Sequence, residues 1–163
     1  MGRIKKILVA MASTEYCRGI FDYSATLARA LDAEIIIVSI INSRDIDAVR
    51  QVAAMGYAVD GENYVASVKE TRKQDIYAIL GDTIFPRERI RTVINVGNPV
   101  DELLKILIHE SVDMVVMGTK GRTDLEHILL GSVAEKMFRR SPVTIVSYRD
   151  EAQAEKLKKR LQL

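Results

Sequence analysis

The sequence has few of the residues that mark disulfide-bonded, proline-rich or metal-binding proteins. Its 163 residues include one cysteine, three prolines, two histidines and no tryptophan, and aromatic residues make up 6% of the chain. A single cysteine, Cys17, cannot form an internal disulfide. The two histidines and the cysteine are widely separated in the chain, so we predict no metal-binding cluster.

Long apolar runs and a surplus of one charge are also absent. The longest apolar runs, such as residues 35–41, are far too short to span a bilayer. The 24 lysines and arginines against 22 acidic residues give a net charge of +2, so no overall field favours nucleic acid or an anionic membrane. The chain opens without the pattern of a secretory signal. We therefore expect a cytoplasmic protein that binds neither nucleic acid nor membrane.

The composition is that of one ordinary globular domain. Hydrophobic residues make up 48% of the chain and charged residues 28%, which suffices for a core without disulfides or metals. Strand-like and helix-like patterns follow each other as in βαβ units. We predict an α/β, Rossmann-like fold with a doubly wound, mainly parallel five-stranded sheet and helices on both faces, in three layers.

Four short apolar runs and one alternating segment, residues 89–96, predict the strands, and helical spacing lies between them. The strands are expected at residues 4–11, 35–41, 89–96, 113–118 and 143–146. Asn98 is a plausible N-cap before Pro99, which suits the first position of a helix. Residues 42–85 are interpreted as helical crossover packing, with a partner-specific surface as the alternative. The domain is expected to span residues 1–149, with a helical tail at 150–163.

The stretch from residue 113 to 148 carries the pattern most indicative of function. An apolar run ends in Gly118, Gly121 follows, and the pair Gly131-Ser132 comes after nine more residues, which gives G-x2-G-x9-G-S. Open α/β sheets bind ligands at the carboxyl ends of their strands, where glycine lets the backbone approach closely. Ser132 is predicted to cap the following helix, whose N-terminus would form an anion site. The two turns together predict a cradle for a polyphosphate.

Other interpretations of the same motif stay open. Gly118 and Gly121 alone equally fit an ordinary strand end and turn. The motif is neither a Walker A loop nor a dinucleotide fingerprint. His127 lies within the nine-residue spacer and is assigned a loop role, while His109 at a helix end and Cys17 in a first helical turn are assigned structural roles.

The spacing, with its flanks DMVVMGTKGR and SPVTIV, resembles the universal stress protein family, specifically its ATP-binding branch. A G-x-P turn at Gly97 matches the family as well, and the resemblance covers about residues 3–148. It implies that the chain binds ATP, with Mg²⁺ or Mn²⁺, as a stress-response module. It also implies a homodimer that pairs through the last strand, from Val143 to Tyr148, an edge that otherwise needs cover.

The resemblance also implies binding positions in the glycine motif and at the strand ends. Those expected to border the phosphates and ribose are Gly118, Lys120, Gly121 and Arg122, and those of the phosphate cradle are Gly131, Ser132 and Val133. Those expected beside the ribose or adenine are Gly97, Met117, Ala10, Met11 and Ile40. Lys120 and Arg122 equally fit solvated loop charges.

One position departs from the family. Nucleotide-binding members usually carry an aspartate after the first strand, where this chain has Ala12. A lost hydrogen bond of this type costs about 1–3 kcal/mol, so we expect weakened or reshaped binding unless Ser13, Thr14 or Glu15 substitutes. Two alternatives therefore remain. One is a nucleotide-free interaction dimer; the other is a slow ATPase or self-phosphorylating protein, for which no catalytic base can be assigned and Ser132 is an acceptor only by proximity.

Overall fold

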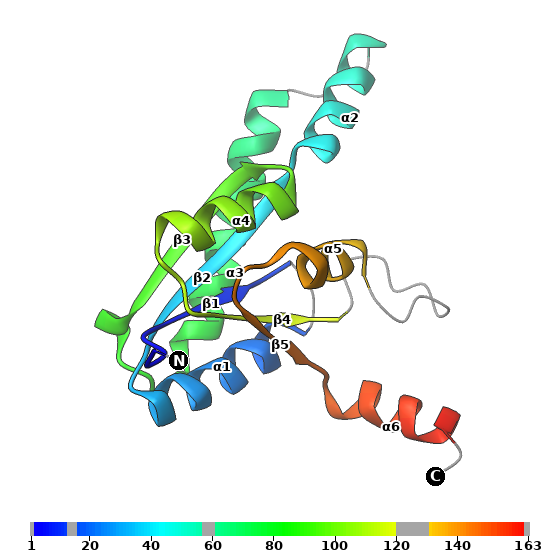
Figure 1. The fold of residues 1–163 in the computed structure, drawn as a ribbon. Coiled ribbons are helices and arrows are strands. Elements are labelled where there is room, and N and C mark those ends of the chain that lie inside the picture. The colour runs from blue at the N-terminus through cyan, green and yellow to red at the C-terminus, as the bar shows by residue number, and fades with distance from the viewer. Residues whose placement is uncertain (1, 13–15, 57–60, 120–130, 162–163) are drawn as a thin grey trace.

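The computed structural model describes residues 2–12, 16–56, 61–119 and 131–161 (Figure 1). Within them, five strands form one sheet: β1 (Lys6–Ala10), β2 (Glu34–Asn42), β3 (Ile90–Gly97), β4 (Met114–Gly118) and β5 (Thr144–Tyr148). The order is β3-β2-β1-β4-β5, and every neighbouring pair is parallel. The predicted doubly wound five-stranded sheet is confirmed.

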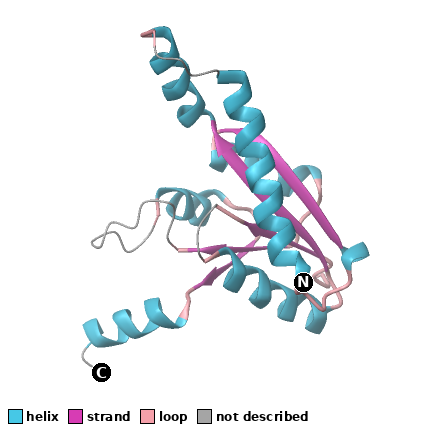
Figure 2. Ribbon diagram, turned by 180° about the vertical axis from the view of Figure 1, so that it is seen from behind, coloured by secondary structure: helices cyan, strands magenta, loops and turns pink. Residues whose placement is uncertain are grey.

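Helices cover both faces of the sheet, as predicted (Figure 2). The helices of the described residues are α1 (Cys17–Leu31), α2 (Ser43–Ala54), α3 (Gly61–Gly81), α4 (Pro99–His109), α5 (Ser132–Arg140) and α6 (Glu151–Leu161). Side chains of α1 and α3 form one core cluster with the sheet, and side chains of α4 and α5 form the other. The chain is therefore a three-layer α/β/α domain with α6 as an additional helix.

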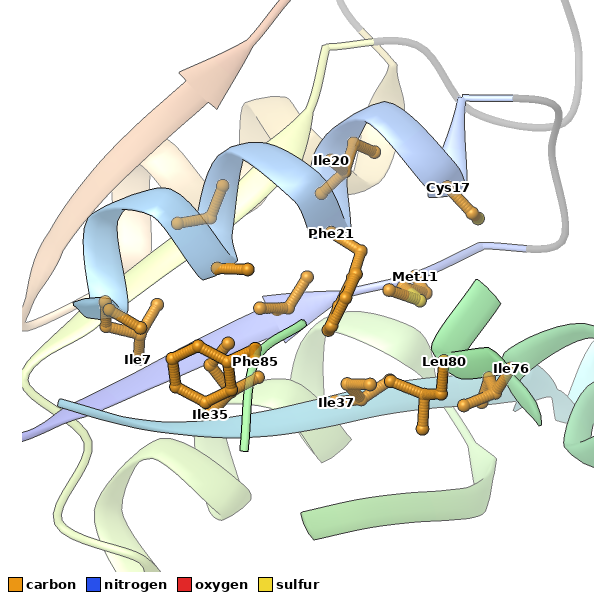
Figure 3. Packing of buried hydrophobic residues seen from close by; sticks show 14 of the residues in the cluster. Ile7, Met11, Cys17, Ile20, Phe21, Ile35, Ile37, Ile76, Leu80 and Phe85 are labelled. Atoms are coloured by element: carbon orange, nitrogen blue, oxygen red, sulfur yellow. The ribbon is translucent and has the colours of Figure 1, made fainter. Parts of the chain in front are cut away.

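The central strands are apolar without alternation because both of their faces are buried. Ile7, Leu8 and Val9 of β1 are all 0% exposed, and Val9 lies in one cluster while Leu8 lies in the other. On the α1 side, Phe21 packs over this strand layer and is itself fully buried (Figure 3). Isoleucine and valine suit these positions because β-branched side chains pack well on a pleated surface.

The helix that precedes β4 is fixed by its first residues. Asn98 is the N-cap of α4, and its side-chain oxygen accepts hydrogen bonds from the N–H groups of Val100 at 3.1 Å and Asp101 at 3.3 Å. Pro99 occupies the first helical position, where its missing N–H costs nothing. The cap predicted from the Gly-Asn-Pro sequence is confirmed.

Within residues 42–85 the structure describes the helices α2 and α3, which extend past the sheet. The β2–β3 pairing continues to Asn42 and Gly97, four residues beyond the point where β2 pairs with the end of β1 at Val38. Figure 1 shows α2 projecting from this extended end. Ile76 and Leu80, near the end of α3, enter the core, so the expected crossover packing is found in this half of the segment.

An ion pair ties β3 to the end of α4 at the amino edge of the sheet. Arg91 donates a hydrogen bond to Glu110, and His109 Nδ1 lies 3.5 Å from the same carboxylate. The hydrogen bond from Arg91, with a smaller contribution from His109, lowers the pKa of Glu110 below its ordinary value. His109 thus stands at a helix C-terminus beside an acid, as the structural assignment expected.

Glu110→Gln is expected to make the stability of the fold less dependent on pH under acidic conditions. Because the folded-state pKa of Glu110 is lowered, its carboxylate stabilises the fold fully above the unfolded value of about 4.3, and this contribution is lost as the pH falls through the folded pKa. Tm measured between pH 6 and pH 3 should therefore fall less in this variant than in the unmodified chain. Arg91→Gln should reduce the fall of Tm over the same pH range. If Tm falls equally in both variants and in the unmodified chain, the Arg91–Glu110 pair does not stabilise the fold.

Candidate functional site

The winding of the sheet reverses between β1 and β4. From β1 the chain proceeds to β2 and β3 on one side, and then returns to β4 and β5 on the other. Open α/β sheets bind ligands outside the carboxyl edge at such a reversal. β1 ends at Ala10 and β4 at Gly118, and Ala10 pairs in register with Met117. The candidate site is therefore the carboxyl edge of β1 and β4.

The two ends of the glycine motif meet at this edge. Thr119 follows β4 directly and is 4% exposed, and its carbonyl oxygen accepts a hydrogen bond from the N–H of Gly131 at 2.7 Å. Residues 120–130 lie between them, outside the described residues. The end of β4 and the start of α5 are thus held side by side, although 12 positions separate Thr119 from Gly131.

The start of α5 corrects one prediction. Gly131 is the N-cap, without a side-chain hydrogen bond, and Ser132 is the first helical residue, so the predicted capping role of Ser132 is wrong. The bond from Gly131 to Thr119 holds Gly131 in an extended conformation, with φ −66° and ψ 148°, and its carbonyl accepts from the N–H of Glu135 at 2.9 Å. The helix therefore begins at Ser132, one residue earlier than a Ser132 cap requires.

This arrangement determines which backbone N–H groups at the N-terminus of α5 can bind a ligand. The N–H of Gly131 is already bound to Thr119. The next N–H groups, those of Ser132, Val133 and Ala134, have no acceptor within α5, as in the first turn of any helix. They carry the positive end of the helix dipole, which favours an anion. Ser132 adds its hydroxyl group to the same turn.

Three of the predicted positions share the face of the sheet on which α5 lies. Ala10, Ile40 and Met117 pack with the α4 and α5 cluster, and Met117 is 5% exposed. Met11 faces the opposite cluster beneath α1, and its N–H extends the ladder by donating to the Val38 carbonyl at 2.9 Å. The structure thus places an apolar surface, formed by Ala10, Ile40 and Met117, on the α5 face of the sheet beside the N-terminus of α5.

Several predicted positions lie outside the described residues. These are Lys120, Gly121 and Arg122 of the glycine motif, His127 of the spacer, and Ser13, Thr14 and Glu15 after β1.

Gly97 stands apart from the other positions. It ends the edge strand β3, two strands from β1, and pairs with Asn42. A Cβ at Gly97 would lie 2.7 Å from Cγ of Glu102. The Glu102 carboxylate accepts hydrogen bonds from Lys105 at 2.7 Å and Asn95 at 3.2 Å, and the bond from Lys105 lowers the pKa of Glu102. Glycine fits here because the Glu102 side chain occupies the space of a Cβ, so any other residue would displace Glu102.

Gly97→Ala is expected to destabilise the fold by about 1 kcal/mol, because the added methyl group forces Glu102 away from Asn95. Urea unfolding should show this change in a double-mutant cycle with Glu102→Ala. In the Glu102→Ala background the alanine at position 97 should cost about 0.5 kcal/mol or less. An equal cost in both backgrounds would show that Glu102 is not the obstacle.

The end of β1 differs from the family pattern in a defined way. Ala12 is exposed and presents only a methyl group where relatives were expected to carry a carboxylate. Its carbonyl oxygen accepts a hydrogen bond from the thiol of Cys17 at 2.7 Å. Cys17 is 7% exposed and belongs to the core cluster, which confirms its structural role.

The structure adds one residue that the sequence interpretation did not single out. Ser147 of β5 has a buried Oγ with no hydrogen-bond partner among the described residues, and it pairs in register with Met117. Side-chain alternation places it on the same face as Ile145, where α5 lies. The strand predicted at residues 143–146 ended one residue before Ser147, so the sequence pattern did not point to this residue. A buried hydroxyl thus lies on the α5 face, one strand from the end of β4.

The question of metal ligands concerns the described residues alone. In the described part of the chain, no group of three or more histidine, cysteine, aspartate or glutamate residues could hold a metal ion. The described ranges also contain no helix of the length and apolarity needed to cross a membrane.

The fold and the site define the class of doubly wound α/β domains whose ligand edge combines a strand end with the N-terminus of the following helix. Comparison with known proteins gives the family. The model of the universal stress protein family matches residues 3–149, and the chain belongs to this family.

Relatives in archaea share most of the length of this chain. Universal stress protein MJ0577 of Methanocaldococcus jannaschii is 31% identical over 126 residues, which is 69% of this chain and 76% of the relative. A universal stress protein of Methanothermobacter thermautotrophicus is 29% identical over 147 residues, or 86% of this chain and 92% of the relative.

Solved structures show the same fold. The structure of MJ0577 superposes with a TM-score of 0.70 at 26% identity and covers 92% of this chain and 99% of its own. A crystal structure of a universal stress protein in complex with cAMP gives a TM-score of 0.58 at 20% identity, covering 91% and 98%.

Proposed function

We propose that the chain binds ATP at the carboxyl edge of β1 and β4, with the triphosphate at the start of α5. The observation that carries this proposal is the 2.7 Å hydrogen bond from Gly131 to Thr119. It holds the end of β4 against the first turn of α5, where the N–H groups of Ser132 and Val133 lack helical acceptors. An anion at this point meets the backbone donors and the positive end of the dipole together.

The apolar surface on the α5 face favours the binding of a nucleotide over that of phosphate alone. Ala10, Ile40 and Met117 lie on the α5 face and offer the kind of surface on which a purine ring packs. Family membership agrees with this proposal, and one family member has been crystallised with a nucleotide, cAMP. Mg²⁺ or Mn²⁺ would be held mainly by the phosphate oxygens, since the described residues gather no metal-binding cluster.

The function we infer is a cytoplasmic stress-response module in which the nucleotide biases the choice of partner. The homodimer would form through β5, which is an edge strand of the sheet. Within the described residues, the outer side of β5 has no paired strand, and such edges normally require cover.

Native mass spectrometry of the protein as purified tests the nucleotide proposal directly. We expect a population heavier than the bare chain by one ATP, with or without a divalent metal, and refilling when ATP is added after dialysis. Protein that is empty and does not take up added ATP would instead support a nucleotide-free scaffold, for which Ala12 at the end of β1 is the structural argument. Following ADP release from the same sample separates binding from hydrolysis.

A further inference from the structure

The strands β2 and β3 continue past the end of β1 and carry a polar side chain on the face that α4 and α5 cover. Ile40 of β2 pairs in register with Asn95 of β3, two residues beyond the last pair between β1 and β2. Ile40 and Val93 lie in the core cluster of α4 and α5, and strand alternation places Asn95 on the same face as Val93. An amide group thus lies at the edge of the apolar surface on the α5 face, directly beside Ile40.

The side chain of Asn95 is held by Glu102 in the first turn of α4. Nδ2 of Asn95 donates a hydrogen bond to Oε2 of Glu102 at 3.2 Å, and Lys105 donates to Oε1 of the same carboxylate at 2.7 Å. The bond from Lys105 lowers the pKa of Glu102 below its ordinary value, so this carboxylate is ionised at neutral pH. Glu102 is therefore a charged acceptor beside the end of β3.

The ionised carboxylate determines which way the amide of Asn95 is turned. A carboxylate accepts hydrogen bonds and cannot donate them, so the NH2 group of the amide must face Glu102. Within the described residues, Oδ1 of Asn95 accepts no hydrogen bond, and only Ser147 Oγ is both buried and without a partner. Oδ1 of Asn95 is thus open to solvent, and it is an acceptor whose orientation is set by the neighbouring acid.

We propose that Asn95 is a specificity-determining residue of the nucleotide site, and that its Oδ1 accepts a hydrogen bond from the N6 amino group of adenine. The inference rests on the proposed function and deepens it, because it names the base that the site prefers. A purine packed on Ile40 brings its edge close to a side chain of the adjacent strand, which in a sheet lies about 4.8 Å away. Asparagine recognises adenine in DNA through the same N6 group.

The same oxygen disfavours guanine. Guanine carries the acceptor O6 where adenine carries the donor N6, so Oδ1 of Asn95 would meet a second acceptor. The amide cannot turn to offer its NH2 group instead, because Oδ1 would then face the carboxylate of Glu102. Glu102 is thus a positioning residue that makes an acceptor of an amide that could otherwise donate or accept. The start of α5, in contrast, would bind the phosphates of either nucleotide.

Purine riboside triphosphate tests the hydrogen bond, because it is ATP without the N6 amino group. We expect the unmodified chain to bind this analogue about tenfold more weakly than ATP, and to bind GTP at least about a hundredfold more weakly. Asn95→Leu keeps a similar side-chain volume without the polar atoms, so ATP and the analogue should bind to it within about twofold of each other. Isothermal titration with each nucleotide measures the dissociation constants.

Glu102→Gln tests the positioning role. Glutamine has nearly the same shape, but its amide can both donate and accept, so the amide of Asn95 can turn. The preference for ATP over GTP should fall about tenfold, whereas a merely structural role of Glu102 would weaken both nucleotides equally and leave their ratio unchanged. Lys105→Gln is the matched control: it removes the other hydrogen bond of the carboxylate from an exposed side chain and should leave the ratio within about twofold.

The results separate a failure of this inference from a failure of the nucleotide site. If the unmodified chain binds ATP and the analogue equally, or if Asn95→Leu keeps the full tenfold preference, Asn95 does not recognise the base, while the site for ATP stands. If the unmodified chain binds none of the three nucleotides, the proposed function and this inference are both wrong. The comparison of ATP with the analogue uses the unmodified chain, so it decides the question even if Asn95→Leu does not fold.

Discussion

Ser132→Asp is expected to weaken ATP binding at least about a hundredfold while leaving the fold as stable as before. The carboxylate would occupy the first turn of α5, where the proposed phosphates meet the N–H groups of Ser132 and Val133. Two like charges about 4 Å apart near a protein surface repel by about 4 kcal/mol. The same carboxylate at a helix N-terminus stabilises the helix by about 0.3–1 kcal/mol. Isothermal titration with ATP and urea unfolding measure the two effects separately.

Ser132→Asn is the matched control for this prediction. It has nearly the shape of aspartate without the charge, so ATP affinity should stay within about tenfold of the unmodified chain. If aspartate and asparagine weaken binding equally, the effect is steric and the helix end is not the anion site. If aspartate leaves binding unchanged, the phosphates lie elsewhere.

Phe21→Ala is expected to lower the free energy of unfolding by about 3–5 kcal/mol. Phe21 is 0% exposed and fills the layer between α1 and the sheet, so its removal leaves a cavity that the surrounding isoleucines of β1 and β2 cannot close (Figure 3). Domains of this size are stable by only about 5–15 kcal/mol. Urea denaturation followed by circular dichroism should therefore show a midpoint shifted far toward lower urea.

Ile84→Ala is the control for the core prediction. Ile84 is also a large apolar residue, but it is 82% exposed. Its truncation should change the free energy of unfolding by no more than about 0.5 kcal/mol. A loss below about 1.5 kcal/mol for Phe21→Ala would mean that α1 is not packed as the structure shows.

Most of the fold was predictable because its signals are local. Continuous runs such as Ile35 to Val38 indicate strands buried on both faces, and the Asn98-Pro99 pair marks a helix start with the chemistry of its own side chains. The helical tail is likewise confirmed at residues 151–161, since its cap and charges are all within the segment.

The features that the sequence did not reveal depend on contacts between distant residues. Ser132 has the residue type of a cap, but a hydrogen bond from Gly131 to Thr119 moves the helix start by one residue. Gly97 matches a glycine of the family pattern. The structure shows a reason that the sequence could not reveal: a side chain at position 97 would collide with Glu102 on α4. The extension of β2 and β3 beyond β1 likewise follows from pairing between distant strands and not from periodicity.

The binding positions taken from the family resemblance remain predictions. Ala10, Met117 and the first turn of α5 gather at one edge, which agrees with a shared ligand. Gly97 lies two strands from β1, and Lys120, Gly121 and Arg122 lie outside the described residues.

Amide chemical shifts during an ATP titration test the central claim most directly. In ¹H–¹⁵N spectra of the labelled protein, the amides of Gly118, Ser132 and Val133 should move first and saturate together, because the end of β4 and the start of α5 would bind one triphosphate. Shifts confined to other elements, or an unchanged spectrum at millimolar ATP, would contradict a nucleotide site at this edge.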